Sequence, residues 1–142
     1  MSVEIRRAQG AAEMDALLDL RHRVFCVEQG VPKREEIDGR DGDAIHLVAV
    51  QDGRVLATCR LLFVERTVQL SRLAVEPEAR RRGIATRLLR ESDREALAAH
   101  ARRIVLHAQT YARELYEADG YEPRGRTFVE AGIEHVAMEK RL

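Results

Sequence analysis

The chain has 142 residues, which is enough to bury a hydrophobic core within one domain and leaves no room for a second. Its 24 basic and 24 acidic residues give a formal net charge of +0, so it lacks the basic excess expected of a general nucleic-acid-binding protein. No apolar run approaches the ~20 residues that span a bilayer, and no basic region precedes an apolar core at the amino terminus, so we expect one cytoplasmic domain, 1–142, without a membrane or nucleic-acid partner.

The first part of the chain predicts a short strand and one helix. Apolar alternation favours a strand over residues 3–7, and the spacing of later apolar residues favours a helix that starts near Gly10 and ends near Val27. The sequence Gly-Val-Pro then interrupts the helix. The charged segment 33–43 that follows is more typical of a solvated loop or a short helix than of a functional site.

Two apolar segments, 45–50 and 55–64, predict the next pair of strands. They are joined by Gln51-Asp52-Gly53-Arg54, and Asp-Gly between apolar strands is a strong hairpin signal because both turn positions tolerate a positive φ. We therefore expect an antiparallel hairpin at this turn.

The strand that begins near Thr67 shows a slip in its apolar phase. Val68 and Leu70 share one parity, whereas Leu73 and Val75 fall on the other. Because the alternation cannot slip by one residue without turning every side chain to the opposite face, we predict a β-bulge between Leu70 and Leu73.

A further strand is predicted over residues 104–109. We expect it to be buried on both faces and to run parallel to the bulged strand, with a crossover helix between them. The bulge should splay the two strands, and splayed parallel strands leave a cleft.

Between these two strands lies a candidate anion-binding segment. Pro77 closes the bulged strand, Arg80-Arg81-Arg82 and Gly83 follow, and an amphipathic helix begins at Ile84. The unpaired N–H groups of a helix N-terminus attract phosphate, and Gly83 lets the backbone approach it closely. A solvated basic face is the alternative, but cations at this end oppose the helix dipole, which favours a bound anion. The expected stripe of apolar and small residues is Ile84, Ala85, Leu88, Leu89, Ser92, Ala96 and Ala99.

Two motifs resemble those of the GNAT-type acyl-CoA N-acetyltransferases. The first is Arg80-Arg81-Arg82-Gly83-Ile84-Ala85, which fits (Gln/Arg)-x-x-Gly-x-(Gly/Ala) after a strand ending Leu-x-Val-x-Pro. The second motif, a short helix ended by glycine, fits Ala-x-x-(Leu/Phe)-Tyr-x-x-x-Gly-(Phe/Tyr) at Ala112, Leu115, Tyr116, Gly120 and Tyr121. Residues 24–29 and 128–135 resemble the small bacterial ElaA-like subgroup, and the resemblance covers nearly the whole chain.

The resemblance implies an α/β fold. Its central sheet would be mixed and mostly antiparallel, with about six to seven strands, a splayed parallel pair and about four flanking helices. It also implies closing strands near residues 121–123 and 133–140. Related enzymes often pair through such terminal strands, so we expect that a homodimer can form.

The resemblance also implies that acetyl-CoA is the cosubstrate. Its pantetheine arm would enter the cleft and pair with the backbone freed by the bulge, and its phosphates would lie at the arginines and the helix start. Gln109 would contact the arm, although a strand-end surface amide is the alternative reading of this residue. The implied binding residues are Leu73, Ala74, Val75, Arg80, Arg81, Arg82, Gly83, Ile84, Ala85, Thr86, Gln109 and Tyr116.

Three residues are candidates for the catalytic steps. Tyr116 matches the family tyrosine that gives a proton to the departing sulfur, and an unperturbed phenol with a pKa near ~10 keeps that proton at neutral pH. The alternative for Tyr116 is an aromatic at the edge of the core. Glu28 and His107 are candidates for the base that accepts the amine proton. Glu28 could instead form a salt bridge at the helix end, and His107 could be a core histidine.

The resulting hypothesis is an acetyl-CoA-dependent N-acetyltransferase in which a primary amine of a small molecule or peptide attacks the thioester directly. A non-catalytic acyl-CoA-binding or regulatory module is the alternative, and Tyr116 argues against it. A nucleotide phosphotransferase would need a Gly-x-x-x-x-Gly-Lys-(Ser/Thr) loop, and RNA binding is disfavoured by 4% aromatic residues. Cys26 and Cys59 are expected to be buried reduced thiols, and the spacing of the histidines predicts no metal site.

Overall fold

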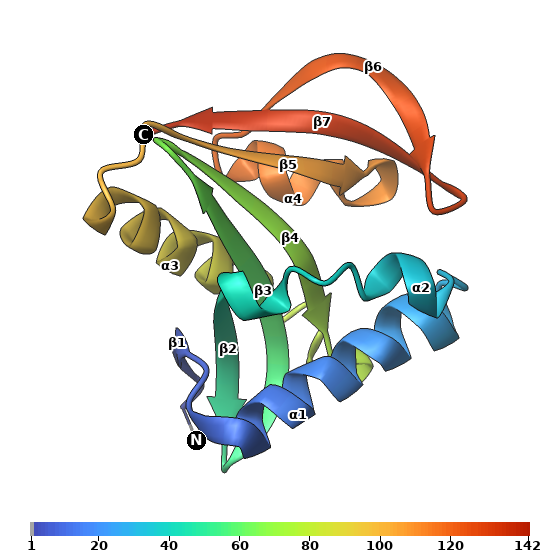
Figure 1. Cartoon of the computed structure of the whole chain (residues 1–142), viewed down its shortest axis with the longest axis vertical. Helices are drawn as coiled ribbons and strands as arrows, with labels where there is room; N and C mark the ends of the chain where they lie inside the picture. The colour runs from blue at the N-terminus through green and yellow to red at the C-terminus, as the bar shows by residue number, and fades with distance from the viewer. Residues whose placement is uncertain (1) are drawn as a thin grey trace.

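The computed structural model describes residues 2–142, in which seven strands form one mixed sheet. Their order is β1-β2-β3-β4-β5-β7-β6 (Figure 1). Among the described residues only β4 and β5 are parallel neighbours, which confirms the mixed, mostly antiparallel sheet that the sequence predicted. The strands are β1 (Glu4–Arg7), β2 (Ile45–Gln51), β3 (Arg54–Val64), β4 (Thr67–Val75), β5 (Arg103–Gln109), β6 (Glu122–Glu130) and β7 (Ile133–Arg141).

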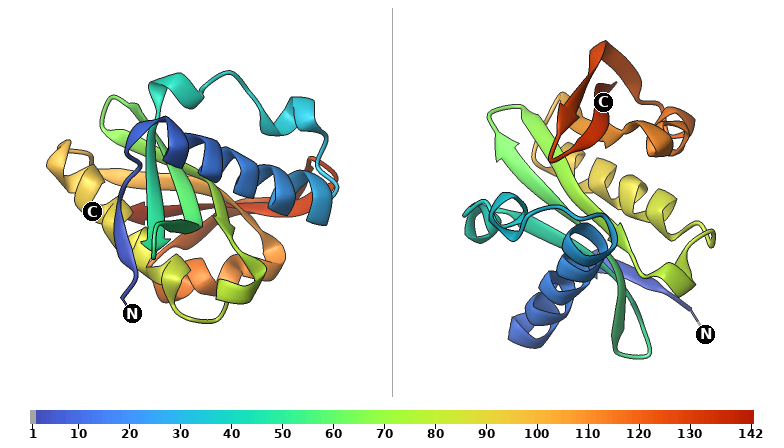
Figure 2. Two further views of the ribbon diagram at one scale, coloured as in Figure 1. Left: turned by 90° about the horizontal axis from the view of Figure 1, so that it is seen from below. Right: turned by 90° about the vertical axis from the view of Figure 1, so that its right-hand side faces the viewer.

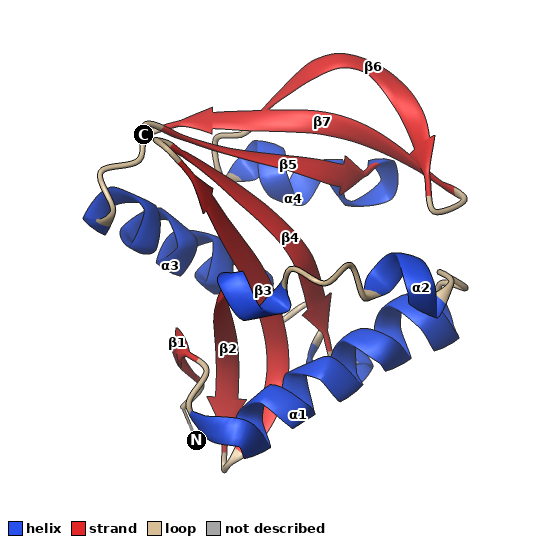
Figure 3. Cartoon of the chain, viewed as in Figure 1, coloured by secondary structure: helices blue, strands red, loops and turns tan. Residues whose placement is uncertain are grey.

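Helices cover both faces of this sheet (Figure 3). The left view in Figure 2, which is seen from below, shows α1 on one side of the strands and α3 and α4 on the other. Each side has its own hydrophobic cluster, which contains Leu17 and Leu20 of α1 on one face and Leu88 and Leu89 of α3 on the other. No helix within residues 2–142 has the length and apolar character needed to cross a bilayer. The α-helices are α1 (Gly10–Arg21), α2 (Lys33–Glu36), α3 (Ile84–Ala98) and α4 (Arg113–Ala118).

The predicted bulge is present in β4. Thr58 of β3 faces Ala74, whereas Arg60 faces Ser71, so β4 takes three residue steps where β3 takes two. Arg72 absorbs the extra residue with a φ of 57°, in the left-handed region that side-chain-bearing residues rarely adopt. The bulge lies between Leu70 and Leu73, as the apolar phase predicted.

The parallel pair β4 and β5 stays together only at its start. Residues 67–69 of β4 pair with residues 103–105 of β5, and the pairing ends there. Figure 1 shows the two strands diverging beyond that point. The backbone of β4 after Gln69 is therefore not matched to β5, and the sheet opens on the side of the bulge.

The hairpin between β2 and β3 also forms as predicted. Asp52 and Gly53 adopt φ angles of 52° and 76°, which is the left-handed geometry that a tight two-residue turn requires.

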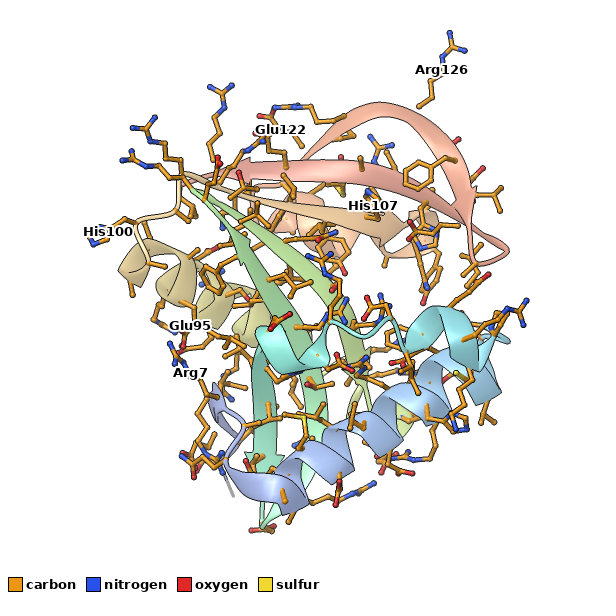
Figure 4. The ribbon with its side chains drawn as sticks, viewed as in Figure 1. Arg7, Glu95, His100, His107, Glu122 and Arg126 are labelled. Carbon is orange, nitrogen blue, oxygen red and sulfur yellow. The ribbon has the colours of Figure 1, made fainter. Side chains whose placement is uncertain are left out.

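A long-range ion pair connects the edge strand to a helix. Arg7 of β1 donates two hydrogen bonds to Glu95 of α3, at 2.9 and 2.6 Å (Figure 4). This ion pair joins the edge strand β1 to α3.

The first helix changes character part-way. α1 ends at Arg21, and a π-helical segment, His22–Glu28, continues it to one residue beyond the predicted end. π-helical turns are rare and frequently occur at functional sites. Apolar spacing predicted a helical backbone here but could not distinguish a π-helix from an α-helix.

Three predictions about burial were wrong. β5 is buried on one face only, because the face that carries His107 opens where β4 has diverged; the His107 side chain is 46% exposed. Ala99 is exposed because α3 ends one residue earlier. Cys26 is only half-buried on the π-helical segment, whereas Cys59 is fully buried and burial raises the pKa of its thiol to about 12.

Candidate functional site

A cavity of about 770 Å³ lies where β4 and β5 separate. Its walls come from β4 and β5, from the π-helical segment and α2, from α4, and from the hairpin of β6 and β7. One end, next to the start of α3, contains Val75, Arg80 and Ala85; the other end is lined by polar and charged side chains of α2 and of the hairpin. Deep clefts of this volume are where small-molecule sites usually lie.

The predicted coenzyme residues divide into two groups. Leu73, Ala74, Val75, Arg80, Ala85, Gln109 and Tyr116 line the cavity. Arg81, Arg82, Gly83, Ile84 and Thr86 lie beside it, in the loop and first turn of α3.

Gly83 is the N-cap residue of α3 and has a φ of 77°. This left-handed backbone conformation favours glycine. A Cβ atom added to Gly83 would meet no atom within 4 Å, which means that the space in front of this glycine is open. Ile84 behind it is 3% exposed and anchors the first turn in the core. The space beside the start of α3 is therefore open, as an anion site at a helix N-terminus requires.

Arg80 already has an anionic partner. Its guanidinium donates two hydrogen bonds to the Glu28 carboxylate, at 2.8 and 2.7 Å, and a third to the carbonyl of Val75 at 3.1 Å. These bonds lower the pKa of Glu28 and raise that of Arg80. Glu28 lies outside the cavity wall that the described residues form. A carboxylate held in this way is a poor base, and the ion pair is the alternative reading that the sequence left open.

Tyr116 lies on α4 with 7% of its surface exposed, at the wall of the cavity. Its ring meets that of Tyr121 edge to face, with the centroids 5.9 Å apart. Burial raises the pKa of Tyr116 well above its ordinary value. The phenol therefore keeps its proton throughout the physiological pH range and is a hydrogen-bond donor toward the cavity.

His107 of β5 lies at the polar end of the cavity, beside the hairpin (Figure 4). Its Nδ1 is 3.0 Å from Oε1 of Glu130, at the end of β6. The core-histidine alternative does not hold, because nearly half of the side chain is exposed and the ring has a carboxylate partner. Glu130 could not be predicted as a site residue from the sequence, because only the folding of the hairpin brings it to β5.

Three polar side chains in the wall of the cavity, Gln109, Gln29 and Tyr111, are joined by hydrogen bonds. Gln109 donates to Oε1 of Gln29 at 2.8 Å, and Gln29 donates to the Tyr111 hydroxyl at 3.2 Å. This chain links the end of the π-helical segment to the end of β5. The sequence analysis did not identify Gln29 and Tyr111 as candidate site residues. Gln29 is placed here by the π-helix that ends just before it, and the apolar spacing of the sequence does not reveal a π-helix.

The segment 33–43 is more than a solvated loop. α2 forms within it, as one of the two predicted alternatives, but Glu36 is 5% exposed and accepts a hydrogen bond from the buried Arg21 at 2.6 Å. Asp38 accepts two hydrogen bonds from Arg60 at 2.8 Å, which lower its pKa. Arg72, the bulge residue, donates to the carbonyl of Glu36 at 3.0 Å. These ion pairs hold α2 over the bulge and close the polar end of the cavity.

Residues 2–142 contain no group of three or more His, Cys, Asp or Glu side chains that could hold a metal ion. The cleft has the start of α3 at one end, the phenol of Tyr116 in its wall and an imidazole–carboxylate pair at the other end.

Comparison with known proteins gives consistent matches over the whole chain. A model of the acetyltransferase (GNAT) domain matches residues 10–142. The chain is 30% identical over 122 residues to the Bacillus subtilis N-acetyltransferase YjcF, which covers 85% of this chain and 87% of that protein. A Pseudomonas aeruginosa acyl-CoA N-acyltransferase structure is 31% identical, with a TM-score of 0.87 over 98% of this chain and 99% of its own. Escherichia coli ElaA is 25% identical, with the same TM-score and coverage.

Proposed function

Because this chain belongs to the GNAT acetyltransferase family, we propose that it transfers an acetyl group from acetyl-CoA to a primary amine of a small molecule or peptide. The observation that carries the proposal is the cleft between β4 and β5, which has the start of α3 at one end and Tyr116 in its wall. An elongated thioester with phosphates at one end matches that arrangement. The Tyr116 hydroxyl favours catalysis over acyl-CoA binding alone, because only the transfer reaction needs a proton donor for the departing sulfur.

The fold offers two features that suit the coenzyme. The backbone of Leu73 to Val75 follows the bulge and pairs with β3 but not with β5, so the N–H and C=O groups on its β5 side can pair with the amides of the pantetheine arm. Phosphates would lie at the first turn of α3, where Gly83 leaves open space and Arg80 adds charge. Gln109 would exchange its bond to Gln29 for one to the arm.

The transfer itself forms one bond and breaks another. The neutral amine nitrogen attacks the carbonyl carbon, the new N–C bond forms, and the C–S bond breaks, so that an amide and a thiol result. One proton leaves the nitrogen to a base and one arrives at the sulfur, for which the Tyr116 hydroxyl is the donor. Backbone N–H groups of the bulged strand would stabilise the oxyanion that forms between these steps.

Calorimetric titration with acetyl-CoA and with S-acetylpantetheine tests the coenzyme site. We expect acetyl-CoA to bind with roughly micromolar affinity and the truncated thioester, which lacks all phosphates, to bind at least about 100-fold more weakly. In Gly83→Glu we expect a loss of at least about 100-fold in acetyl-CoA affinity, because a carboxylate would stand where the phosphates lie.

Gly83→Ala is the matched control. Like Gly83→Glu, this variant places a side chain at a φ of 77°, but it adds only a methyl group to open space. Its affinity for acetyl-CoA should therefore stay within about threefold of the wild-type value. Equal binding of both thioesters would show that the helix start holds no phosphate. Binding without release of thiol in the presence of amines would favour the non-catalytic alternative.

A substitution at Glu28 tests whether this residue is a base or only the partner of Arg80. We expect Glu28→Gln to bind acetyl-CoA about two- to fivefold more tightly, because it frees the Arg80 guanidinium for phosphate, and to leave kcat near the wild-type value. Glu114→Gln, which removes an exposed charge on α4, is the control for net charge. A fall in kcat specific to Glu28→Gln would instead assign the base to Glu28.

A further inference from the structure

The hairpin of β6 and β7 brings a carboxylate onto an imidazole at the polar end of the cavity. His107 projects from β5, Glu130 ends β6, and both line the cavity. Oε1 of Glu130 lies 3.0 Å from Nδ1 of His107, within hydrogen-bonding distance. A carboxylate accepts hydrogen bonds and does not donate them, so the proton between them belongs to Nδ1 of His107. The other ring nitrogen, Nε2, then carries a lone pair.

Aromatic contacts hold this pair from one side. The Phe128 ring meets His107 edge-on, with the centroids 5.0 Å apart and the planes at 78°, and it stacks on His135 at 6.0 Å and 22°. Nδ1 of His135 donates to the carbonyl of Ile133 at 2.7 Å, which fixes that ring in turn. The orientation of His107 is therefore set by one hydrogen bond and one ring contact, both made by β6.

We propose that His107 is the general base of the acetyl transfer and that Glu130 is the residue that positions it, an inference that rests on the function proposed above. Nε2 of His107 takes the proton that the amine nitrogen loses as its bond to the acetyl carbon forms. The imidazolium then releases that proton to water, while the sulfur receives one from Tyr116, which water reprotonates. The carboxylate of Glu130 fixes the tautomer and stabilises the imidazolium.

Titratable groups lie beside His107 on the hairpin, and charged side chains line the other walls of the cavity. β6 contributes Glu130, and β7 contributes His135, whose Nε2 is 3.8 Å from Oε2 of the same carboxylate. The charged side chains of the other walls are Glu35, Glu36, Asp38, Arg40, Arg60, Arg72 and Arg80. Within residues 2–142, Glu130 is the carboxylate at hydrogen-bonding distance from the His107 ring, so its removal should disturb the tautomer and orientation of that ring most.

Nitrogen NMR of the imidazoles and the rate of acetylation test this proposal together. In the wild-type protein we expect His107 as the tautomer protonated on Nδ1, and acetylation of n-butylamine or a lysine-containing tripeptide. Glu130→Gln should mix the tautomers and lower kcat/KM, measured at one fixed pH, about ten- to hundredfold. Glu130→Asp should restore part of kcat/KM.

Glu134→Gln is the matched control. It neutralises a hairpin carboxylate that accepts a hydrogen bond from the Thr110 hydroxyl and lies outside the cavity wall. Its His107 tautomer and its kcat/KM should equal those of the wild type. If the wild type acetylates either amine and Glu130→Gln keeps the wild-type tautomer and kcat/KM, the positioning role fails while the proposed function stands. A wild-type His107 protonated on Nε2 would also overturn it. Absence of acetyl-CoA binding, by contrast, would overturn the proposed function itself.

Discussion

Tyr116→Phe is expected to lower kcat by a factor of about 10²–10⁴, which is the range over which positioned general acids contribute. The variant removes one hydroxyl from the cavity wall and leaves the ring contact with Tyr121 in place, so the fold and the affinity for acetyl-CoA should not change. Steady-state thiol release gives kcat, and calorimetry gives the affinity. Loss of binding in parallel with kcat would mean that the hydroxyl holds the coenzyme rather than the leaving sulfur.

The pH dependence of the wild type provides a second readout of the same hydroxyl. Burial raises the pKa of Tyr116, so its proton is retained to higher pH than in a free phenol. An acid that stays protonated gives no basic limb, and kcat should therefore remain flat between about pH 8 and pH 10. A fall in kcat within that window would indicate a donor of ordinary or lowered pKa.

Tyr121→Phe is the control for both measurements. Tyr121 is the neighbouring buried tyrosine, with 2% of its surface exposed, and its hydroxyl finds no hydrogen-bond partner within the part of the chain that the structure describes. Removing an unpaired buried hydroxyl is close to neutral for folding. We expect kcat within about threefold of the wild type, so that the position of the hydroxyl, rather than the loss of a tyrosine, accounts for the effect at Tyr116.

The parts of the fold that the sequence predicted correctly depend on local signals. The opposite parity of Leu70 and Leu73 requires a bulge within a few residues, and Asp52-Gly53 requires a tight turn. Gly83 marks the start of α3 because it follows a strand and precedes an amphipathic pattern. Each signal is complete within one element and its turn, so no knowledge of the sheet order is needed to read it.

The parts that the sequence missed depend on contacts between distant segments. Glu130 meets His107 across 23 residues, and Glu28 meets Arg80 across 52. Both contacts depend on which residues face each other once the sheet is assembled, and apolar periodicity does not specify that register. A charged residue in a segment such as 33–43 looks solvated until its buried partner is known, as the pairing of Glu36 with Arg21 illustrates.

The second large effect is expected on stability, at Arg21. Its side chain is 1% exposed and donates to Glu36 at 2.6 Å and to Asp41 at 2.9 and 3.3 Å. Removing one partner of a buried ion pair leaves an uncompensated charge in the interior, which costs about 3–5 kcal/mol. We therefore expect Arg21→Met to lower the free energy of unfolding by about 3–5 kcal/mol, measured by urea denaturation.

Two further variants separate the buried charge from the lost contacts. Arg94→Met removes an arginine whose side chain is 71% exposed and whose partner Glu91 lies one helical turn away, so it should cost less than about 1 kcal/mol. Arg21→Met combined with Glu36→Met removes both buried charges and should recover most of the loss, because apolar side chains of similar volume replace the pair. If the double variant were no more stable than Arg21→Met, the cost would come from packing and from Asp41 rather than from the unpaired carboxylate of Glu36.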